Sequence, residues 1–302
     1  MPRPIPPRLP MAACAALCCA CAAQPPAPAQ TLLPMAEGRW VPLPDFCDEF
    51  SGERLDAARW LDHNPTFKGR APALFSPSNV KVRGGRLHLT AQPGPAPDAP
   101  EGYRDFTTAS VQSLAAVRYG YFEVRARPMA ARASSSFWFA TQSAAWTWPP
   151  PPVLRRIPGG AKGQAGGCFE EIDVFEICGK GGPHENVHYM TAHSCQPGME
   201  QTQSVCEAWT PPFLMTEDFH VFGFEWTQDH LRWYVDGVLK AEQPNLYWHH
   251  AEIMMFDSEA MPKWFGDIDP GTLPATFSID YVRAWGRADG PTDRRTLVEY
   301  GK

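Results

Sequence analysis

Apolar and polar residues alternate with a period of two along much of this 302-residue chain. In the segment GYFEVRARP (120–128), Phe122 and Val124 alternate with Glu123 and Arg125, which is the pattern of a half-buried β-strand. The same alternation recurs in 219–227, 231–240 and 275–286. The pattern therefore predicts a protein built from several β-strands.

Glycine pairs mark the turns between these strands. Gly84-Gly85 separates the apolar positions of NVKV from those of LHLTA, and Asp236-Gly237 separates LRWYV from VLKA, as expected for tight hairpins. No segment has apolar residues at helical spacing over three turns, and the best candidate, 56–60, is about one turn long. Many antiparallel strands without helices predict two stacked sheets or a barrel.

Composition supports this interpretation and excludes several classes of partner. The 33 prolines disfavour a helical protein, because each interior proline removes a helix hydrogen bond. A net charge of -6 gives no basic surface for nucleic acid, and no run of 18 apolar residues could cross a bilayer. We therefore expect a protein that binds no nucleic acid, has no transmembrane segment and is a monomer.

The first residues have the features of an export signal. An apolar run from Met11 to Ala23 follows Arg3 and Arg8, and a Pro/Ala-rich stretch comes after it. We expect a secreted, cell-surface or periplasmic protein, and a lipid anchor on a cysteine of the signal stays an alternative to cleavage. The expected organisation is a signal peptide (1–23), a linker (24–39), one folded domain (40–290) and a C-terminal tail (291–302).

Five cysteines lie outside the signal: Cys47, Cys168, Cys178, Cys195 and Cys206. In an oxidising compartment Cys195 and Cys206 could close the polar loop between them as a disulfide. Pairing of Cys168 with Cys178 is a second alternative and leaves Cys47 unpaired. The spacing of the five is too wide for a zinc site.

Candidate chemistry lies in CFEEIDVFEICG (168–179), where acids stand among strand-forming residues. Glu171 and Asp173 share one face of a regular strand, whereas Glu176 lies an odd number of residues away and would point to the other face. A β-bulge at Val174-Phe175 would bring Glu176 round to join them. Neighbouring carboxylates raise one another's pKa, which can separate a general acid from a nucleophile. A solvated edge or a calcium site are the alternatives.

The chain resembles glycoside hydrolase family 16, in the branch with a bulged ExDxxE motif. The resemblance runs from about 45 to 286 and rests on DEFSG, YGYFEVRARP, SSSFWFA, EEIDVFE, NVHY, DFHVFGFEWTQDHLRWYVDG and FSIDYVRAWG. It implies a β-jelly-roll sandwich of two antiparallel sheets with a concave substrate cleft. It also implies a retaining endo-hydrolase with Glu171 as nucleophile, Glu176 as general acid/base and Asp173 orienting the nucleophile.

Within the family, FWFA and FDSEA are most similar to the agarases, porphyranases and κ-carrageenases. The resemblance therefore implies a polysaccharide substrate, specifically a red-algal galactan, and no cofactor for catalysis. Two alternatives remain at this point: a carbohydrate-binding module without chemistry, and a transglycosylase. The transglycosylase shares the first half-reaction and differs in what intercepts the intermediate.

Four further residues are candidates for binding sugar. Trp138 faces opposite Phe137 and Phe139 and could form the floor of a subsite, while Trp146 could form a cleft wall; core packing is the alternative for both. The resemblance places His188 near the acid/base, with a structural histidine as the alternative. It also matches Glu259, with Asp257, to a position that contacts sugar hydroxyls, although a surface acid is equally consistent with the sequence.

Charged residues elsewhere allow two more expectations. Arginines gather at Arg118, Arg125, Arg127 and Arg132, with Arg70 in an earlier loop. Their guanidinium groups suit sulfate, but the alternation along the strand favours a solvated face. Asp280, in the last strand, is similar to a position that holds a structural calcium in many family members.

Overall fold

The computed structural model describes residues 40–97, 99–141, 169–195, 199 and 201–290. All of them belong to one compact unit. The predicted signal peptide, linker and C-terminal tail lie outside the described residues. No helix in these ranges is long and apolar enough to cross a membrane.

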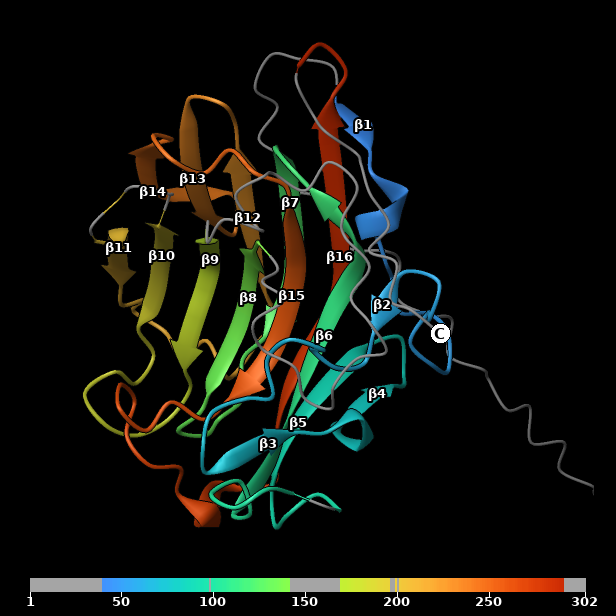
Figure 1. Ribbon diagram of the computed structural model, residues 1–302, viewed down its shortest axis with the longest axis vertical. Coiled ribbons are helices and arrows are strands. Elements are labelled where there is room, and N and C mark those ends of the chain that lie inside the picture. The colour runs from blue at the N-terminus through green and yellow to red at the C-terminus, as the bar shows by residue number, and fades with distance from the viewer. Residues whose placement is uncertain (1–39, 98, 142–168, 196–198, 200, 291–302) are drawn as a thin grey trace, which may run out of the picture. The chain divides into compact units, whose positions relative to one another are not determined.

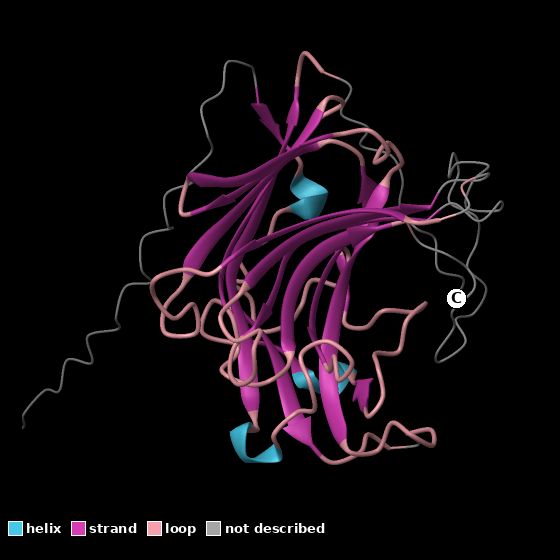
Figure 2. Cartoon of the chain, turned by 90° about the vertical axis from the view of Figure 1, so that its left-hand side faces the viewer, coloured by secondary structure: helices cyan, strands magenta, loops and turns pink. Residues whose placement is uncertain are grey.

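The described chain is almost entirely β-structure, which confirms the predicted class. Two antiparallel sheets lie face to face (Figures 1 and 2). The first sheet has the order β11 (Gln203–Trp209), β10 (His188–Cys195), β9 (Phe169–Cys178), β8 (Ser134–Ala140), β15 (Glu252–Glu259) and β6 (Phe106–Val117), with β2 (Trp60–Leu61) paired to β6.

The second sheet continues from β5, which also pairs with β6 at Gln92 and Pro93. Its order is β5 (Leu87–Pro93), β16 (Ala275–Arg287), β7 (Gly120–Arg127), β12 (His220–Trp226), β13 (His230–Val235) and β14 (Val238–Pro244), with β1 (Trp40–Pro42) on β16 and β4 (Val80–Val82) on β5. The short β3 (Ala73–Phe75) pairs in parallel with β6. The helical elements are three single turns: η1 (Pro44–Phe46), η2 (Pro77–Asn79) and η3 (Pro270–Thr272).

Aromatic rings from both sheets fill the space between them. Phe175 on β9 meets Phe222 on β12 with ring centroids 4.3 Å apart, and Phe122 on β7 meets Phe139 on β8 at 4.8 Å. All four rings are fully buried. Burying such rings supplies the main stabilisation of a sandwich, because each removes a large apolar area from water.

The predicted hairpins are confirmed. Gly84 and Gly85 have φ of 58° and 70° between β4 and β5, and Asp236 and Gly237 have φ of 49° and 77° between β13 and β14. Positive φ at both central positions matches the right-handed twist of the flanking strands. The one-turn candidate at 56–60 forms a turn that leads into β2.

Candidate active site

A β-bulge in β9 brings the three acids to one face, as the sequence predicted. On β8, Phe137 pairs with Phe175 and the next residue, Trp138, pairs with Asp173, so β9 contains one extra residue at Val174. The pairing with β10 shifts at the same place. The apolar residues of β9 join the core on the other face: Ile172, Val174, Phe175 and Ile177.

Neighbouring strands extend this face into rows of side chains. Adjacent strands lie about 4.8 Å apart, so residues paired across them lie side by side. The rows, read from β8 through β9 to β10, are Ala140–Glu171–His193, Trp138–Asp173–Thr191 and Ser136–Glu176–Tyr189.

Asp173 is the most enclosed of the three acids. Thr191 donates a hydrogen bond from Oγ1 to Asp173 Oδ2, and His193 Nε2 lies 4.0 Å from the same oxygen. Burial raises the pKa of Asp173 to about 7, while the Thr191 hydrogen bond and the positive charge of Arg70 oppose that rise.

Glu171 and Glu176 differ in the charges around them. Burial raises the pKa of both well above the ordinary glutamate value, and Asp173 adds to both shifts. Arg70 opposes the shift at Glu171, and its guanidinium interacts with the charge of Glu176 as well. Neighbouring carboxyls with raised pKa values titrate together, so one can stay protonated while the other is ionised.

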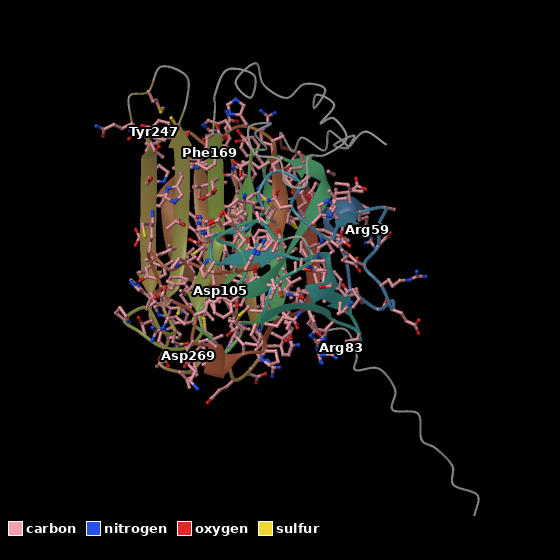
Figure 3. The ribbon with its side chains drawn as sticks, turned by 60° about the horizontal axis from the view of Figure 1, so that its bottom comes forward. Arg59, Arg83, Asp105, Phe169, Tyr247 and Asp269 are labelled. Atoms are coloured by element: carbon pink, nitrogen blue, oxygen red, sulfur yellow. The ribbon has the colours of Figure 1, made fainter. Side chains whose placement is uncertain are left out.

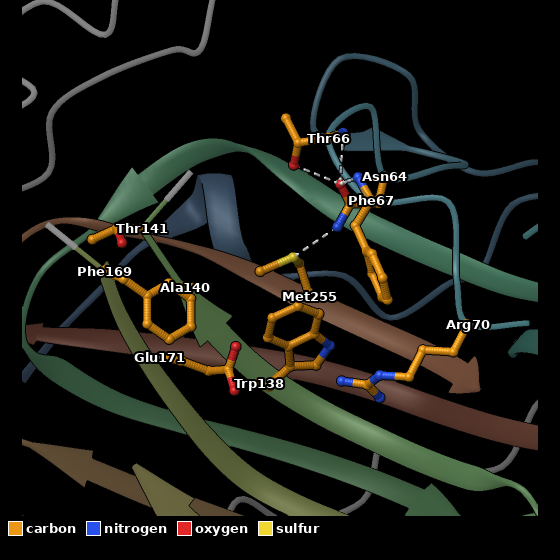
Figure 4. A pocket seen from close by; sticks show the side chains of 10 residues that line it. All are labelled: Asn64, Thr66, Phe67, Arg70, Trp138, Ala140, Thr141, Phe169, Glu171 and Met255. Carbon is orange, nitrogen blue, oxygen red and sulfur yellow. Dashed lines mark hydrogen bonds between the residues drawn. The ribbon is translucent and has the colours of Figure 1, made fainter. Parts of the chain in front are cut away.

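A pocket of about 320 Å³ opens beside Glu171 (Figure 4). Its walls are mostly apolar, with Phe67, Trp138, Phe169 and Met255, and Arg70 reaches into it from the loop before β3. Phe137 and Phe139 are fully buried while Trp138 is partly exposed, which confirms the predicted opposite orientation. An aromatic side chain in such a wall can stack on the apolar face of a sugar.

Two more acids line the face from β15. Asp257 accepts a hydrogen bond from Trp138 Nε1 at 2.9 Å, and Glu259 Oε2 lies 2.8 Å from Arg70 Nη1. Both carboxyls are buried, and burial raises the pKa of Asp257 to about 7. Glu259 is therefore part of the polar network beneath the cleft, and Asp257 holds the indole of Trp138.

His188 does not reach the cleft, so its predicted contact with the acid/base or the sugar is wrong. Its ring is fully buried between Phe175 and Phe222, and Nε2 lies 2.9 Å from the carbonyl oxygen of Val174. Successive side chains of a strand point to opposite faces, and His188 pairs with the core residue Ile177. The histidine of the cleft face is His193, whose Nδ1 lies 2.7 Å from Ser204 Oγ.

The predicted Cys195–Cys206 disulfide is also wrong. Cys206 pairs with Thr191, four residues before Cys195 on β10, so the two cysteines are separated by about 13 Å of strand. A disulfide needs Cα atoms within about 7 Å. Both thiols are free. Cys168, the partner in the second predicted pairing, lies outside the described residues.

Asp280 does not fit a calcium ion. Arg86 Nε lies 3.2 Å from its Oδ1 and Arg125 Nη1 lies 2.7 Å from its Oδ2, so two guanidinium groups already neutralise the carboxylate. Within the described ranges, the group with metal-ligand spacing is Glu171, Asp173 and His193, whose ligand atoms lie within 4.8 Å of one another. Two of these three residues, Glu171 and Asp173, carry carboxyls of the candidate active site, where acid–base chemistry explains why they lie together.

One predicted site residue, Trp146, lies outside the described residues. The described site residues that sequence reasoning missed are Thr191, His193 and Tyr189. They could be assigned to the cleft only from the register of β10, because the sequence does not show which face of that strand each side chain occupies.

Comparison with known proteins gives a consistent result. The family model for the β-porphyranase A–D domain of glycoside hydrolase family 16 matches residues 40–286. The chain is 31% identical over 206 residues to β-porphyranase D of Zobellia galactanivorans and 30% identical over 227 residues to β-porphyranase B of Phocaeicola plebeius. These alignments cover 63% and 66% of this chain, and 45% and 66% of the relatives, so the chain spans about half to two thirds of their length.

Solved structures show the same fold. Porphyranase B from Zobellia galactanivorans superposes with a TM-score of 0.67 at 21% identity, covering 83% of this chain and 96% of that one. The κ-carrageenase from Pseudoalteromonas carrageenovora, in complex with a κ-carrageenan oligosaccharide, superposes with a TM-score of 0.66 at 21% identity, covering 85% and 99%. The predicted jelly-roll sandwich is therefore confirmed.

Proposed function

The chain belongs to glycoside hydrolase family 16, and from that premise we propose that it cleaves internal β-linkages of a red-algal galactan with retention of anomeric configuration. The observation that carries the proposal is the bulge in β9, which gathers Glu171, Asp173 and Glu176 on the cleft face. Retaining hydrolases need two carboxyl groups of different proton affinity beside one glycosidic bond.

In the first step Glu171 attacks the anomeric carbon while Glu176 donates its proton to the departing glycosidic oxygen. The bond to the leaving sugar breaks as the bond to Glu171 forms, which leaves a glycosyl-enzyme ester. In the second step the ionised Glu176 takes a proton from water, and the hydroxyl displaces Glu171. The environment supports these roles, because Arg70 favours the charged form of Glu171 and Asp173 favours the protonated form of Glu176.

The substrate class is proposed from the pocket and the relatives together. The relatives described above are named porphyranases and a κ-carrageenase. The pocket combines apolar walls with the guanidinium of Arg70, which suits a sugar chain with anionic substituents. A polysaccharide cannot enter a cell intact, so the proposal places the enzyme outside the cytoplasm, consistent with the apolar run from Met11 to Ala23.

The roles of the two glutamates are tested by Glu171→Gln and Glu176→Gln. Glu171→Gln should lower the release of reducing ends from porphyran, agarose or κ-carrageenan by about a thousandfold or more, because the nucleophile is lost. Glu176→Gln should cost about a hundredfold on polysaccharide and much less on aryl glycosides, whose leaving groups need no proton. A Glu171→Gln protein with normal activity would contradict the assignment of Glu171 as the nucleophile, whereas a wild type that binds galactan without releasing reducing ends would favour a binding module.

Thermal unfolding of the same variant provides the control for folding. A carboxyl whose pKa is raised in the folded protein binds more protons there than in the unfolded chain, so its contribution to stability falls as the pH rises through its folded pKa. Glu171→Gln removes one such buried carboxyl. The variant should therefore stay folded and melt a few degrees above the wild type at pH 8.

A further inference from the structure

Arg132 is a cation without a partner beside the cleft face. It lies in the bend before β8, two residues before Ser134, which pairs with Cys178, the second residue after Glu176 on β9. The side chain is half-buried, and its buried Nε has no hydrogen-bond partner. Arg132 forms no ion pair within the described residues. A buried guanidinium nitrogen without an acceptor is costly, so its retention indicates a ligand.

Three glycines shape the space around this guanidinium. Gly181, Gly182 and Gly266 have φ of 86°, 85° and 90°, a region that side-chain-bearing residues rarely adopt. A Cβ at Gly181 would lie 2.9 Å from Arg132 Nη2, and one at Gly266 would lie 3.5 Å from Arg132 Cδ. The backbone therefore holds Arg132 in a cradle that a side chain at Gly181 would obstruct.

The carboxylate of Glu185, close to Arg132 in the loop of Gly181, is bonded to the backbone instead. Glu185 accepts a hydrogen bond from the backbone nitrogen of Gly181 at 2.7 Å, and its side chain is exposed. Cys178 lies close enough for Arg132 to favour its charged form, although burial raises the pKa of the thiol. The positive charge of Arg132 is therefore free to meet an anion that enters the cradle.

An aromatic shelf stands beside the cradle. The ring of Tyr189 lies 4.7 Å from that of Trp264, and the Tyr189 hydroxyl is 2.6 Å from His184 Nδ1. Both rings are partly exposed, and the shelf rests on Phe265, which is buried. A fixed and partly exposed aromatic surface can stack on a pyranose ring, because the C–H face of the sugar is apolar.

The shelf and the cradle lie on the Glu176 side of the cleft. Tyr189 pairs directly with Glu176 across β9 and β10, whereas the Arg70 pocket lies beside Glu171. Figure 3 shows Phe169, which lines that pocket, at one end of the strands and Asp269, in the loop that follows Trp264, at the other. The shelf therefore stands beside Glu176 and the pocket opens beside Glu171, while the Arg70 guanidinium extends along the cleft to Glu259, which lies level with Ser134 and Cys178.

We propose that Arg132 and the Tyr189–Trp264 shelf form a second subsite, which binds a sulfate-bearing sugar on the Glu176 side of the cleft. The planar guanidinium offers two parallel N–H groups to two sulfate oxygens, and the shelf supports the ring that carries the ester. This inference rests on the proposed function for its substrate class. It assigns to Arg132 a role that the other arginines of the group do not share.

The other arginines are already engaged. Arg118 donates to the carbonyl oxygen of His249 at 3.1 Å, and Arg125 pairs with Asp280 on the second sheet. Arg127 lies over the ring of Phe219 on that same sheet. These positions agree with the predicted solvated face for Arg125 and Arg127. Arg132, in the bend before β8, is the member of the group whose Nε has no hydrogen-bond partner beside the cleft face.

Binding to an inactive protein tests the subsite without turnover. The probes are sulfated porphyran oligosaccharides and the same oligosaccharides after chemical desulfation, titrated into the Glu171→Gln protein by calorimetry. Adding Arg132→Gln should raise the Kd for the sulfated probe about tenfold and leave the Kd for the desulfated probe unchanged. Arg83→Gln, on an exposed turn of the second sheet, is the matched control and should change neither value.

Two more variants separate a binding role from a structural one. Arg132→Lys keeps the positive charge but lacks the two parallel N–H donors of the guanidinium, so it should recover part of the affinity. Gly181→Ala keeps Arg132 but places a methyl group close to its Nη2, so it should weaken binding of the sulfated probe and not of the desulfated one. An unchanged Kd for the sulfated probe in Arg132→Gln, or equal losses of affinity for both probes, would overturn the proposal. Failure of the wild type to hydrolyse any galactan would instead contradict the proposed function, while the binding difference could still be measured.

Discussion

At the scale of single residues, the account depends on how Asp173 sets the proton affinities of its two neighbours. Its charge contributes to the raised pKa of both Glu171 and Glu176, and its own carboxyl is held by Thr191. Arg70 opposes the shift at Glu171. Asp173 therefore raises the proton affinity of both glutamates, and Arg70, which interacts with the charge of each, limits that rise at Glu171.

Replacing Asp173 by asparagine tests this electrostatic role. The neutral amide no longer raises the pKa of Glu171 or Glu176, so both limbs of the pH profile of kcat/KM should move to lower pH. Asp280→Asn, on the second sheet, is the control and should leave both limbs in place. Limbs that stay fixed in Asp173→Asn would show that the charge of Asp173 does not tune the glutamates.

Residue types alone predicted the acids but not their surroundings. Glu171, Asp173 and Glu176 were found because three carboxylates in an apolar strand are costly unless they are used. His188 was wrongly assigned to the cleft because its face depends on the register of β10, and a shift of one residue exchanges the two faces. For the same reason, the sequence did not assign Tyr189 and His193 to the cleft.

At the scale of elements, the bulge determines which side chains can cooperate. Deleting Val174 removes the extra residue, so strict alternation then keeps Glu171, Asp173 and Glu176 on one face. Deleting Ile172, an equally buried residue of the same strand, places Glu171 and Asp173 on opposite faces.

These two deletions form a matched pair. The Val174 deletion should stay folded and keep measurable hydrolysis of galactan at a reduced rate. The Ile172 deletion should be inactive and lose about 3 kcal/mol or more of unfolding free energy, because it turns a carboxyl into the core. Chemical denaturation and reducing-end release measure both effects. Equal behaviour of the two variants would contradict the role given to the bulge.

The strands that periodicity predicted are those in which apolar residues alternate with polar or small ones. β7, β12, β13 and β16 have this pattern and were recognised by it. β6 and β15 were not, because they combine small, polar and apolar side chains without alternation. The pairing of β15 with β6 and with β8 is a tertiary feature that periodicity does not report.

At the scale of the whole described unit, the fold class could be predicted from local sequence patterns, whereas the residues of the cleft could not. Turn glycines and alternating strands predict stacked sheets. Arg70 and Glu171 are far apart in the sequence and line one pocket only because the loop before β3 crosses the strands that carry the acids (Figure 4). The same packing places Trp264 beside Tyr189 and Arg132 beneath two glycine loops.

The central claim is that Glu171 and Glu176 act on one glycosidic bond by double displacement, and the configuration of the first product tests it most directly. Proton NMR of porphyran, agarose or κ-carrageenan during the first minutes of cleavage reports the new reducing end before it mutarotates. The account predicts that the β-anomer appears first and the α-anomer grows later. Initial release of the α-anomer would show inversion and would contradict the mechanism derived from the bulged strand.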